Sequence, residues 1–523
     1  MLPPRDPARL SGRRFDLVVV GAGIHGACAA WEAARRGLAV ALLDRGDFGA
    51  ATSANSLKVL HGGLRYVQHA DLPRVRTSAL ELARLRRLAP HLVRPLPVVV
   101  PTGAGLTESP LAFRAALALY DALGGKGSHP GEGSGLPAPG ILRKDAAPGL
   151  FDRGALWYDA QVVHPERLTL EFVLAAAACG AEVCTYLEAA ALRTEGGRAT
   201  GIEAVDLETG RSVTIAGEAV LEITGPWVGR LHPLPDLPGL ALGMNVVLAG
   251  TRVRTAVGMR SRRDASRDPV GGGRRFLFLA PWEGRTLLGT SYRVHQGAAD
   301  VQVGPEDWRD LLDDAREAIP GLKLREEDVV HVHAGLLPLD PGGKGLADRA
   351  WVVHHGARGG PRGLVTVAGV KYTTGRAVAE QVVLRILRRL GRPATAPPRS
   401  GTLGHDGFVA DAPPGSGAAR LQALHGARWA RVAEATGWDA PVAPGSAVLA
   451  GEILHAVRSE MAVHLDDVVL RRTDLGTTGE PAPRALRAVA ELMGAELGWD
   501  ARRHARELGR VEAAYRPLRG GRG

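Results

Sequence analysis

The chain has 523 residues and a formal net charge of +10, with 45% hydrophobic and 23% charged residues. This length is too great for one core, so we expect two or three domains with a large buried interior. The basic residues are spread along the chain without a nucleic-acid-binding motif, and the three cysteines form no Cys-x-x-Cys pair. Nucleic-acid binding and a disulfide framework are therefore excluded.

Residues 1–14 lack the apolar core of a signal peptide, and the sequence has no apolar run of about 18 residues. With so few cysteines, this pattern predicts a cytoplasmic protein in a reducing compartment. We therefore expect any membrane contact to be peripheral, on the inner face of the cell membrane.

The first predicted elements form a βαβ unit. Residues 15–20 are a short apolar run that predicts a buried parallel strand, and residues 27–36 are Ala-rich and favour a helix. A second apolar run at residues 38–43 ends at Asp44. An acidic residue at the end of this strand can accept hydrogen bonds from ribose hydroxyls. The unit predicts a Rossmann-type nucleotide-binding domain.

The turn of this unit carries Gly21, Gly23 and Gly26 in Gly-x-Gly-x-x-Gly spacing. Gly21 permits the tight turn, Gly23 lets the backbone approach a pyrophosphate, and Gly26 lets helix and strand pack closely. The helix N-terminus would face the phosphates. NAD and FAD share this fingerprint, so the turn predicts a dinucleotide without identifying it.

Later segments are assigned by breaker density and periodicity. Residues 124–140 are Gly-rich and predict a flexible surface loop, and residues 236–349 alternate apolar and polar residues as strands do. Residues 393–416 are rich in Pro and Gly and predict a linker. Beyond it, helical periodicity is present near residues 418–435, 447–465 and 483–515.

Two motifs follow the fingerprint, ATSANSLK at 51–58 and HGGLRY at 61–66, and GVKYTTGRAVAE lies at 369–380. With these motifs the chain resembles the FAD-dependent glycerol-3-phosphate dehydrogenases, a branch of the D-amino-acid-oxidase-like flavoproteins. The other collinear matches are LAPHL at 88–92, YDAQV at 158–162, TGPWV at 224–228, PWEGRTLLGTS at 281–291 and a cap-like EILHAVRSEMAVHLDDVVLRRT at 452–473.

The resemblance covers nearly the whole chain and implies an α/β fold, α+β overall, with three domains. It implies a Rossmann-type FAD-binding domain, an antiparallel-sheet substrate domain that roofs the pocket, and a C-terminal helical cap domain. Their expected residues are 12–105, 155–235 and 350–395 for the first, 106–154 and 236–349 for the second, and 396–523 for the third.

The resemblance also implies a non-covalently bound FAD and the residues that contact it. Most of these lie in the motifs already quoted, and Val183 lies outside them. The expected FAD contacts are Gly21, Gly23, Ile24, His25, Gly26, Asp44, Arg45, Thr52, Ser53, Ser56, Lys58, His61, Gly62, Gly63, Leu64, Val183, Thr224, Gly225, Trp227, Gly369, Val370, Lys371, Tyr372 and Thr373. Covalent attachment through His25 or His61 stays open, and no metal is expected.

In the resembled family, a hydride leaves C2 of sn-glycerol 3-phosphate for flavin N5 and a base takes the hydroxyl proton. The pocket needs cations for a phosphate dianion and one proton acceptor. The resemblance places Arg65, Tyr66, Arg349 and Lys371 at the substrate. Lys371 is the leading candidate for the base.

Two positions depart from the family pattern. An expected arginine in Gly-x-Arg-Pro is Leu337, and an expected histidine is Asn245, which can hydrogen-bond substrate but cannot act as a base near neutral pH. Loss of one charge-assisted phosphate contact costs about 1.5 to 3 kcal/mol, or roughly ten- to a hundredfold in affinity. His331 and His333, which alternate just before Leu337, are candidates to compensate.

Three functions therefore stay open: a glycerol-3-phosphate dehydrogenase, a related FAD oxidoreductase acting on another hydroxy or amino substrate, and a flavin-binding relative without turnover. The electron acceptor is a quinone or oxygen, and the long C-terminal helices allow a homo-oligomer. Arginines crowd one Gly-rich stretch, which leaves two alternatives open: a solvated loop with no partner, which is favoured, and contact with an anionic membrane surface. These arginines are Arg260, Arg262, Arg263, Arg267, Arg274 and Arg275.

Overall fold

The computed structural model describes most of the chain. The described residues are 1–64, 71–102, 109–124, 139–142, 150, 153–234, 236–237, 239–263, 270, 276–296, 301, 303–343, 345–393, 403, 412–413, 415–434 and 438–519. Five residues singled out above, Arg65, Tyr66, Arg267, Arg274 and Arg275, lie outside them, as do most of the expected 124–140 loop and the expected 393–416 linker.

The first sheet is built around the predicted βαβ unit. In spatial order its strands are β16 (Trp351–His354), β17 (Leu364–Ala368), β10 (Ser212–Glu222), β1 (Arg14–Val20), β2 (Val40–Leu43) and β7 (Glu182–Cys184). The four consecutive pairs from β17 to β7 are parallel, and β8 (Leu187–Glu195) and β9 (Arg198–Asp206) extend β10 as an antiparallel hairpin. Strand β1 is nearly all apolar because a parallel strand is covered on both faces.

Three helices pack together beside this sheet: α1 (Ile24–Ala34), α4 (Pro165–Ala178) and α6 (Gly375–Arg389). In α1, Ala27, Ala29, Ala30 and Ala33 are fully buried, and their small side chains let α1 approach both neighbours closely. The predicted Rossmann-type domain is therefore present. The carboxyl ends of its parallel strands, β1 and β2 among them, lie at the same edge of the sheet.

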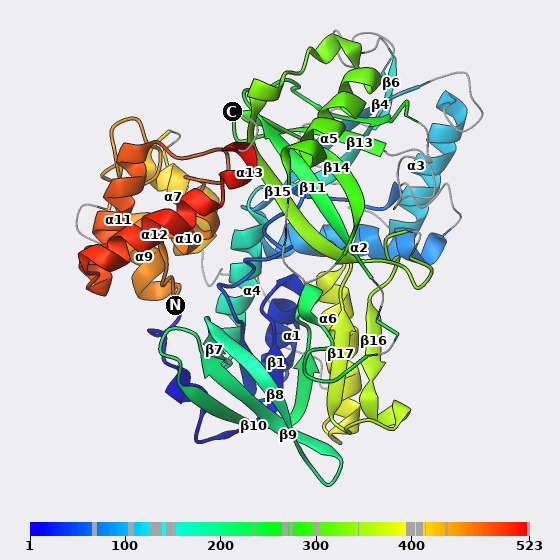
Figure 1. The fold of residues 1–523 in the computed structure, drawn as a ribbon. Coiled ribbons are helices and arrows are strands. Elements are labelled where there is room, and N and C mark those ends of the chain that lie inside the picture. The colour runs from blue at the N-terminus through cyan, green and yellow to red at the C-terminus, as the bar shows by residue number, and fades with distance from the viewer. Residues whose placement is uncertain are drawn as a thin grey trace.

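The second sheet lies above the first in Figure 1. In spatial order it contains β15 (Val329–Pro338), β11 (Leu240–Leu248), β14 (Arg285–His295), β13 (Phe276–Trp282), β12 (Ala256–Arg260), β4 (Val93–Pro101), β6 (Gly154–Val162) and β3 (Val59–Leu60), and β5 (Gly140–Leu142) pairs with β6. Its neighbouring strands are antiparallel except for the pair of β12 and β4. Strands β3, β4 and β6 thus pair with the substrate-side sheet, although they lie in segments expected in the FAD-binding domain.

Helices flank this second sheet. They are α2 (Leu72–Leu88) and α3 (Pro110–Gly124), which pack together, and α5 (Pro305–Ala318), which packs on β11 and β14. Trp308, Leu311, Leu312 and Ala315 give α5 a buried stripe at helical spacing. Short 3₁₀ helices span Pro7–Leu10, Gly225–Trp227, Pro320–Leu322, Glu326–Asp328, His355–Arg358 and Gly426–Arg428.

The C-terminal residues form a helical unit, drawn in orange and red at the side of the two sheets in Figure 1. Its helices are α7 (Gly417–His425), α8 (Trp429–Val432), α9 (Ala450–Ser459), α10 (Leu465–Asp467), a π-helical turn (Val468–Arg472), α11 (Pro483–Leu497), α12 (Ala501–Ala513) and α13 (Arg516–Arg519). The helical periodicity of residues 483–515 resolves into α11 and α12. Gly498 separates them because it adopts a left-handed conformation with φ of 66°, which suits glycine.

Buried ion pairs join the helical unit to the FAD-binding sheet. Asp47, just after β2, pairs with Arg471 at 2.6 Å and with Arg472 at 2.7 Å, and its side chain is fully buried. Leu2 N–H donates to the carbonyl oxygen of Ser459 at 2.8 Å, and Figure 1 shows the N-terminus beside α9. The helical unit is thereby fixed beside the carboxyl end of β2, close to the predicted ribose-binding acid.

His464 provides a pH-sensitive part of this junction. Its Nε2 lies 2.9 Å from Glu208 of the β9–β10 turn and its Nδ1 2.9 Å from Glu507 of α12. Burial alone would lower the pKa of His464, but these two hydrogen bonds, helped by Asp467 and opposed by Arg510, raise it to about 9. The imidazolium is therefore the form that the folded protein prefers.

We expect the stability of the protein to fall as pH rises through about 9. The folded pKa of His464 exceeds its usual value, so its contribution of roughly 2 kcal/mol is complete below about pH 6.5 and is lost above about pH 9. Thermal unfolding between about pH 6 and pH 10 measures this. His464→Gln should make the unfolding temperature less dependent on pH, whereas the control His504→Gln on α12 should not. An unfolding temperature that changes equally with pH in the wild type and in His464→Gln would contradict the assignment.

No helix among the described residues is long and apolar enough to span a bilayer.

Candidate functional site

A cavity of about 1960 Å³ lies where the two sheets meet. The fingerprint turn, the ATSANS segment, the HGG turn, the TGPW segment and the GVKYT segment all line it. Motifs that are more than three hundred residues apart in sequence thus converge on one space. Its size exceeds the range of about 300 to 1000 Å³ of usual small-ligand pockets, which suits a dinucleotide together with a substrate.

The fingerprint glycines form a cradle that no larger residue would fit. Gly21 has φ of 105°, and a Cβ there would lie 2.7 Å from the carbonyl oxygen of Ile223. A Cβ on Gly26 would lie 1.8 Å from the carbonyl oxygen of Gly21. Helix α1 begins immediately after Gly23, and its amide groups offer an anion-binding terminus. The geometry fits a pyrophosphate.

Asp44 closes the nucleotide end of the cavity. Its carboxylate accepts hydrogen bonds from the N–H of Ala22 at 2.6 Å and of Gly46 at 2.9 Å. Burial raises the pKa of Asp44 to about 6, while the two amide donors hold it down. The amides fix the carboxylate at the end of β2, and its remaining lone pairs can accept from ribose hydroxyls. Beside it the guanidinium of Arg45 lies over the ring of Trp227.

His25, in the first turn of α1, lies on the cavity wall and is half-buried. A Cβ on Gly369 would lie 2.5 Å from His25 Cε1, so the ring packs directly on the GVKYT segment. Burial lowers the pKa of His25 to about 4, and its Nε2 finds no hydrogen-bond partner among the described residues. A neutral imidazole with an unpartnered nitrogen on the wall fits contact with a bound flavin dinucleotide.

The HGG turn is held by Asp159 of β6. Its Oδ1 accepts from the N–H of Gly62 at 2.8 Å, and its Oδ2 lies 2.9 Å from His61 Nδ1. Gly62 is required because a Cβ there would lie 2.2 Å from the hydroxyl of Tyr120 on α3. The carboxylate of Asp159 thus positions His61 and Gly63 on the cavity wall.

The first turn of α4 supports two cofactor segments at once. The fully buried Lys58 ammonium lies 3.4 Å from Glu166 and 4.7 Å from the ring centre of Trp282. The hydroxyl of Tyr372 donates to the carbonyl oxygen of Pro165 at 2.7 Å. Burial lowers the pKa of Lys58, and Glu166 opposes that shift. Lys58 therefore does not line the cavity but fixes the ATSANS segment to α4.

The second sheet and Lys371 line the part of the cavity where the resemblance predicts the substrate. Asn245 of β11 is buried, and its Oδ1 accepts from the hydroxyl of Thr290 at 2.8 Å. Leu337 of β15 and Tyr292 of β14 line the same wall near Gly243. The two positions that depart from the family pattern are thus both on the cavity, where a substrate would meet them.

The cavity brings together most of the residues predicted from the sequence. Those on its lining are Gly21, Gly23, Ile24, His25, Asp44, Arg45, Thr52, Ser53, Ser56, His61, Gly63, Leu64, Thr224, Gly225, Trp227, Asn245, Gly369, Val370, Lys371, Tyr372 and Thr373. Gly26, Lys58, Gly62 and Val183 are not on the lining; Lys58 and Gly62 lie behind it in the contacts described above, and Val183 is a buried residue of β7.

Arg349 is exposed in the turn before β16 and is not among the described residues that line the cavity. Its substrate contact stays a prediction, as do those of Arg65 and Tyr66, which lie outside the described residues. His331 and His333 are buried near Trp282 and Tyr515 and do not line the cavity either. Burial and nearby Lys58 lower the pKa of both, so they offer no proton acceptor to the substrate.

Sequence reasoning missed Asp159, Glu166 and the aromatic wall, by which we mean Phe113, Trp157, Phe276 and Phe278 on the cavity. Asp159 stood inside the quoted YDAQV motif and could have been singled out as a charge within an apolar strand. The ring centres of Phe113 and Trp157 lie 5.9 Å apart in a tilted pair, and those of Phe276 and Phe278 lie 5.1 Å apart in an edge-to-face pair. Because these aromatics come from three separate elements, no local pattern marked them.

Comparison with protein families gives two matches along the chain. Residues 16–383 match a family of FAD-dependent oxidoreductases, and residues 413–504 match the C-terminal domain of alpha-glycerophosphate oxidase. The first match covers both sheets and the whole cavity. The second covers most of the helical unit.

Curated relatives are similar over nearly the full length. A glycerol-3-phosphate dehydrogenase of Mycobacterium leprae is 32% identical over 97% of this chain and 89% of its own. Glycerol-3-phosphate dehydrogenase 1 of Mycobacterium tuberculosis is 33% identical over 93% of this chain and 96% of its own.

Solved structures share the fold. The glycerol-3-phosphate dehydrogenase of Bacillus halodurans complexed with FAD superposes with a TM-score of 0.71 at 24% identity, covering 98% of this chain and 96% of that one. L-alpha-glycerophosphate oxidase of Mycoplasma pneumoniae with FAD bound gives 0.52 at 14% identity over 74% and 97%. At these identities the likeness establishes the architecture.

Proposed function

Because the chain belongs to the FAD-dependent oxidoreductase family and, within it, to the glycerol-3-phosphate dehydrogenases, we propose that it oxidises sn-glycerol 3-phosphate to dihydroxyacetone phosphate. FAD is its cofactor. The observation that carries the proposal is the shared cavity: the glycine cradle and Asp44 define a nucleotide end, while Lys371 and Asn245 define a polar substrate end.

A few residues of the cavity carry the proposed reaction. The N-terminus of α1 and Asp44 hold the dinucleotide, and bound FAD supplies the hydride acceptor. Lys371 takes the proton of the substrate's C2 hydroxyl as the C2 hydride leaves, so that the carbon–oxygen double bond forms. Asn245, held by Thr290, donates its amide N–H to a substrate oxygen. The aromatic wall limits the access of water.

A second candidate is oxidation of a different hydroxy or amino substrate, and Leu337 favours it. Leu337 puts an apolar side chain on the cavity where the family pattern has an arginine. If the substrate carries a phosphate, Leu337→Arg should lower its KM by roughly tenfold to a hundredfold, because one charge-assisted contact is restored. Steady-state kinetics measures this, with Leu337→Met as the control for size. An unchanged or raised KM would indicate a substrate without an anionic group at this position.

The electron acceptor that the cavity supports best is a quinone. The aromatic wall and the apolar residues Ala112, Ala115, Ala116 and Leu119 of α3 line one part of the cavity. His61 contacts Phe278 with ring centres 5.0 Å apart, so this part adjoins the HGG turn. A flat apolar ring would be received there. Faster reoxidation by a soluble short-chain quinone than by oxygen, slowed in Phe278→Ala, would support this acceptor.

We place the protein in the cytoplasm, peripheral on the inner membrane face. Arg260 and Arg262 are exposed at the cavity, and Arg263 pairs with Asp310 and Glu317. Anionic lipid attracts such arginines, and a membrane surface would present the quinone. Co-sedimentation with anionic but not neutral vesicles, abolished by salt, would support this placement.

The oligomeric state is a separate question. Sedimentation of the free protein decides between a monomer and a homo-oligomer.

Turnover with a soluble artificial acceptor tests the proposed reaction. sn-Glycerol 3-phosphate should support acceptor reduction and yield one dihydroxyacetone phosphate per two electrons. Glycerol, the enantiomeric phosphate and 2-hydroxy acids should be poor substrates. Turnover with an amine or a 2-hydroxy acid but not with the phosphate ester would contradict this reaction and support the second candidate, oxidation of a different hydroxy or amino substrate.

A further inference from the structure

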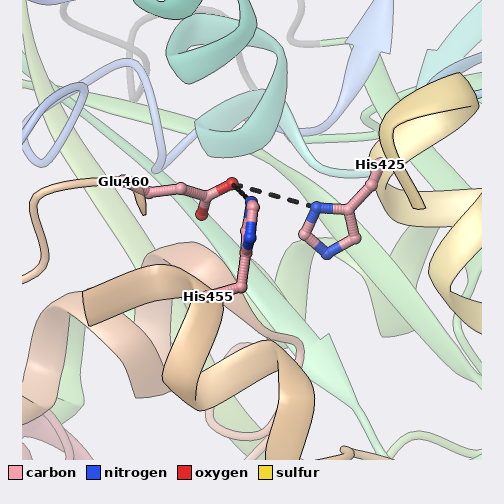
Figure 2. A group of neighbouring side chains, drawn as sticks. All are labelled: His425, His455 and Glu460. Atoms are coloured by element: carbon pink, nitrogen blue, oxygen red, sulfur yellow. Dashed lines mark ion pairs between the residues drawn. The ribbon is translucent and has the colours of Figure 1, made fainter. Parts of the chain in front are cut away.

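A separate cluster of metal-ligating side chains lies in the C-terminal helical unit. His425 ends α7, His455 lies in α9, and Glu460 follows α9 directly. Figure 2 shows both imidazole rings turned toward the carboxylate of Glu460. None of the three lines the cavity, so the cluster has no part in the proposed redox site.

The spacing of the ligand atoms suits a metal ion. His455 Nε2 lies 3.4 Å and His425 Nδ1 3.8 Å from Glu460 Oε1, and one ligand atom of each residue lies within 4.8 Å of the others. Zinc bound tetrahedrally at about 2.0 to 2.2 Å separates its ligand atoms by about 3.3 Å. Small side-chain rotations would therefore complete the geometry.

One of these groups is buried without a hydrogen bond. The side chains of His425 and Glu460 are 2% and 1% exposed. Both ring nitrogens of His425 find no hydrogen-bond partner among the described residues, whereas Glu460 Oε1 lies 2.6 Å from Arg167. At 3.8 Å the contact between His425 Nδ1 and Glu460 Oε1 is too long for a hydrogen bond. Buried polar atoms are normally satisfied, so the ring of His425 requires a partner.

We propose that His425, His455 and Glu460 bind one divalent transition-metal ion, with zinc as the best fit. Two imidazoles and one carboxylate are ligands that zinc accepts, whereas calcium and magnesium prefer sets made of oxygen. Three protein ligands leave a fourth coordination position.

Nearby arginines determine the charge of the ligand that would take this fourth position. Arg167 of α4 lies 2.6 Å from Glu460 Oε1, and Arg472 lies 3.6 Å from Oε2. Each also faces another carboxylate, since Arg167 lies 3.2 Å from Glu171 and Arg472 2.7 Å from Asp47. Glu171 and Asp47 are shared in turn with Arg428 and Arg471, so the surroundings of Glu460 are rich in arginine. A bound dication adds positive charge, so an anion such as hydroxide or chloride completes the site.

The position of the cluster gives the metal a structural role. The carbonyl oxygen of Ser459, next to Glu460, accepts from Leu2 N–H, and Arg167 belongs to the helix that supports Lys58 and Tyr372. A metal here would join α7 to α9 beside α4 and the N-terminal segment. It would therefore stabilise the contact between the helical unit and the FAD-binding sheet.

Zinc binding by the purified flavoprotein tests the proposal. The full chain is dialysed against zinc chloride and then against metal-free buffer, and zinc per chain and the thermal midpoint are measured. We expect one zinc per chain and a midpoint that rises with zinc and falls with chelator. His455→Ala should weaken zinc binding about 100-fold or more, as loss of a ligand costs at least as much as loss of its supporting groups.

The matched control is His504→Ala on α12, which removes a histidine of the same unit outside the cluster and should bind zinc as the wild type does. Glu460 is left unchanged because its loss would strip Arg167 and Arg472 of their partner. His425→Gln is the second variant and should also lose zinc. A wild type that retains no zinc, or one whose zinc survives in both variants, overturns the proposal; the first outcome requires no variant to fold.

Discussion

Lys371→Met should retain FAD and lose about 10²- to 10⁴-fold in the rate of flavin reduction by sn-glycerol 3-phosphate, the usual worth of a general base. Lys371 lies in the turn between β17 and α6 and lines the cavity beside Tyr372. His331 and His333 are buried away from the cavity, and Asn245 cannot take a proton near neutral pH. Lys371 lines the cavity and is therefore preferred to these three as the proposed base.

Rapid mixing under anaerobic conditions measures the reduction step directly. Lys323→Met, an exposed lysine at the end of a 3₁₀ helix, is the matched control and should reduce at the wild-type rate. Full-speed reduction in Lys371→Met would assign the base elsewhere, with Tyr66 next to be examined.

Gly26→Ala should yield a protein without bound flavin. The added methyl group would lie 1.8 Å from the carbonyl oxygen of Gly21, a contact with backbone that no side-chain rotation relieves. Helix α1 must then move away from the fingerprint turn, at a cost of about 3 kcal/mol in unfolding free energy. Because Gly21 and Gly23 belong to the same turn, the displacement also removes the anion-binding terminus.

Flavin absorbance per chain and urea unfolding measure the two effects. Gly509→Ala is the control, since a Cβ at this position in α12 meets nothing within 4 Å and alanine favours a helix interior. The Gly509→Ala protein should bind flavin normally, and its unfolding midpoint should lie at the same urea concentration as that of the wild type or at a higher one. A Gly26→Ala protein that is fully yellow and as stable as wild type would mean that the fingerprint turn is not the phosphate cradle.

The nucleotide end of the site could be predicted because its chemistry is local. Gly21, Gly23 and Gly26 lie within six residues, and Asp44 follows the next strand, so spacing alone fixes their arrangement. The structure confirms the strand, helix and second strand with shifts of a few residues at their ends. It also confirms the mixed α/β architecture with a helical C-terminal unit.

The supporting contacts could not be predicted, because they join distant segments. Asp159 meets Gly62 across 97 positions and Glu166 meets Lys58 across 108, and nothing near either residue in sequence indicates its partner. Strands β4 and β6 show the same limit. Their apolar pattern predicts strands but not which sheet they join, and they pair in the second sheet rather than the first.

The residues at the substrate end of the cavity could be predicted only in part from the sequence. Motif position put Asn245 and Leu337 at the substrate, and the structure places both on the cavity. His331 and His333, which alternate as a catalytic pair could, are instead buried against Trp282 and Tyr515. Periodicity shows which residues share a strand face, but not what covers that face.

Anaerobic titration of the purified protein with sn-glycerol 3-phosphate tests the account most directly. The visible absorbance of the flavin should bleach completely on addition of the phosphate ester, and glycerol and 2-hydroxy acids should have little effect. That result would place FAD and substrate in one cavity and show that Leu337 and Asn245 are compatible with this reaction. A yellow protein that the phosphate ester does not bleach would contradict the proposed function while leaving the flavin site intact.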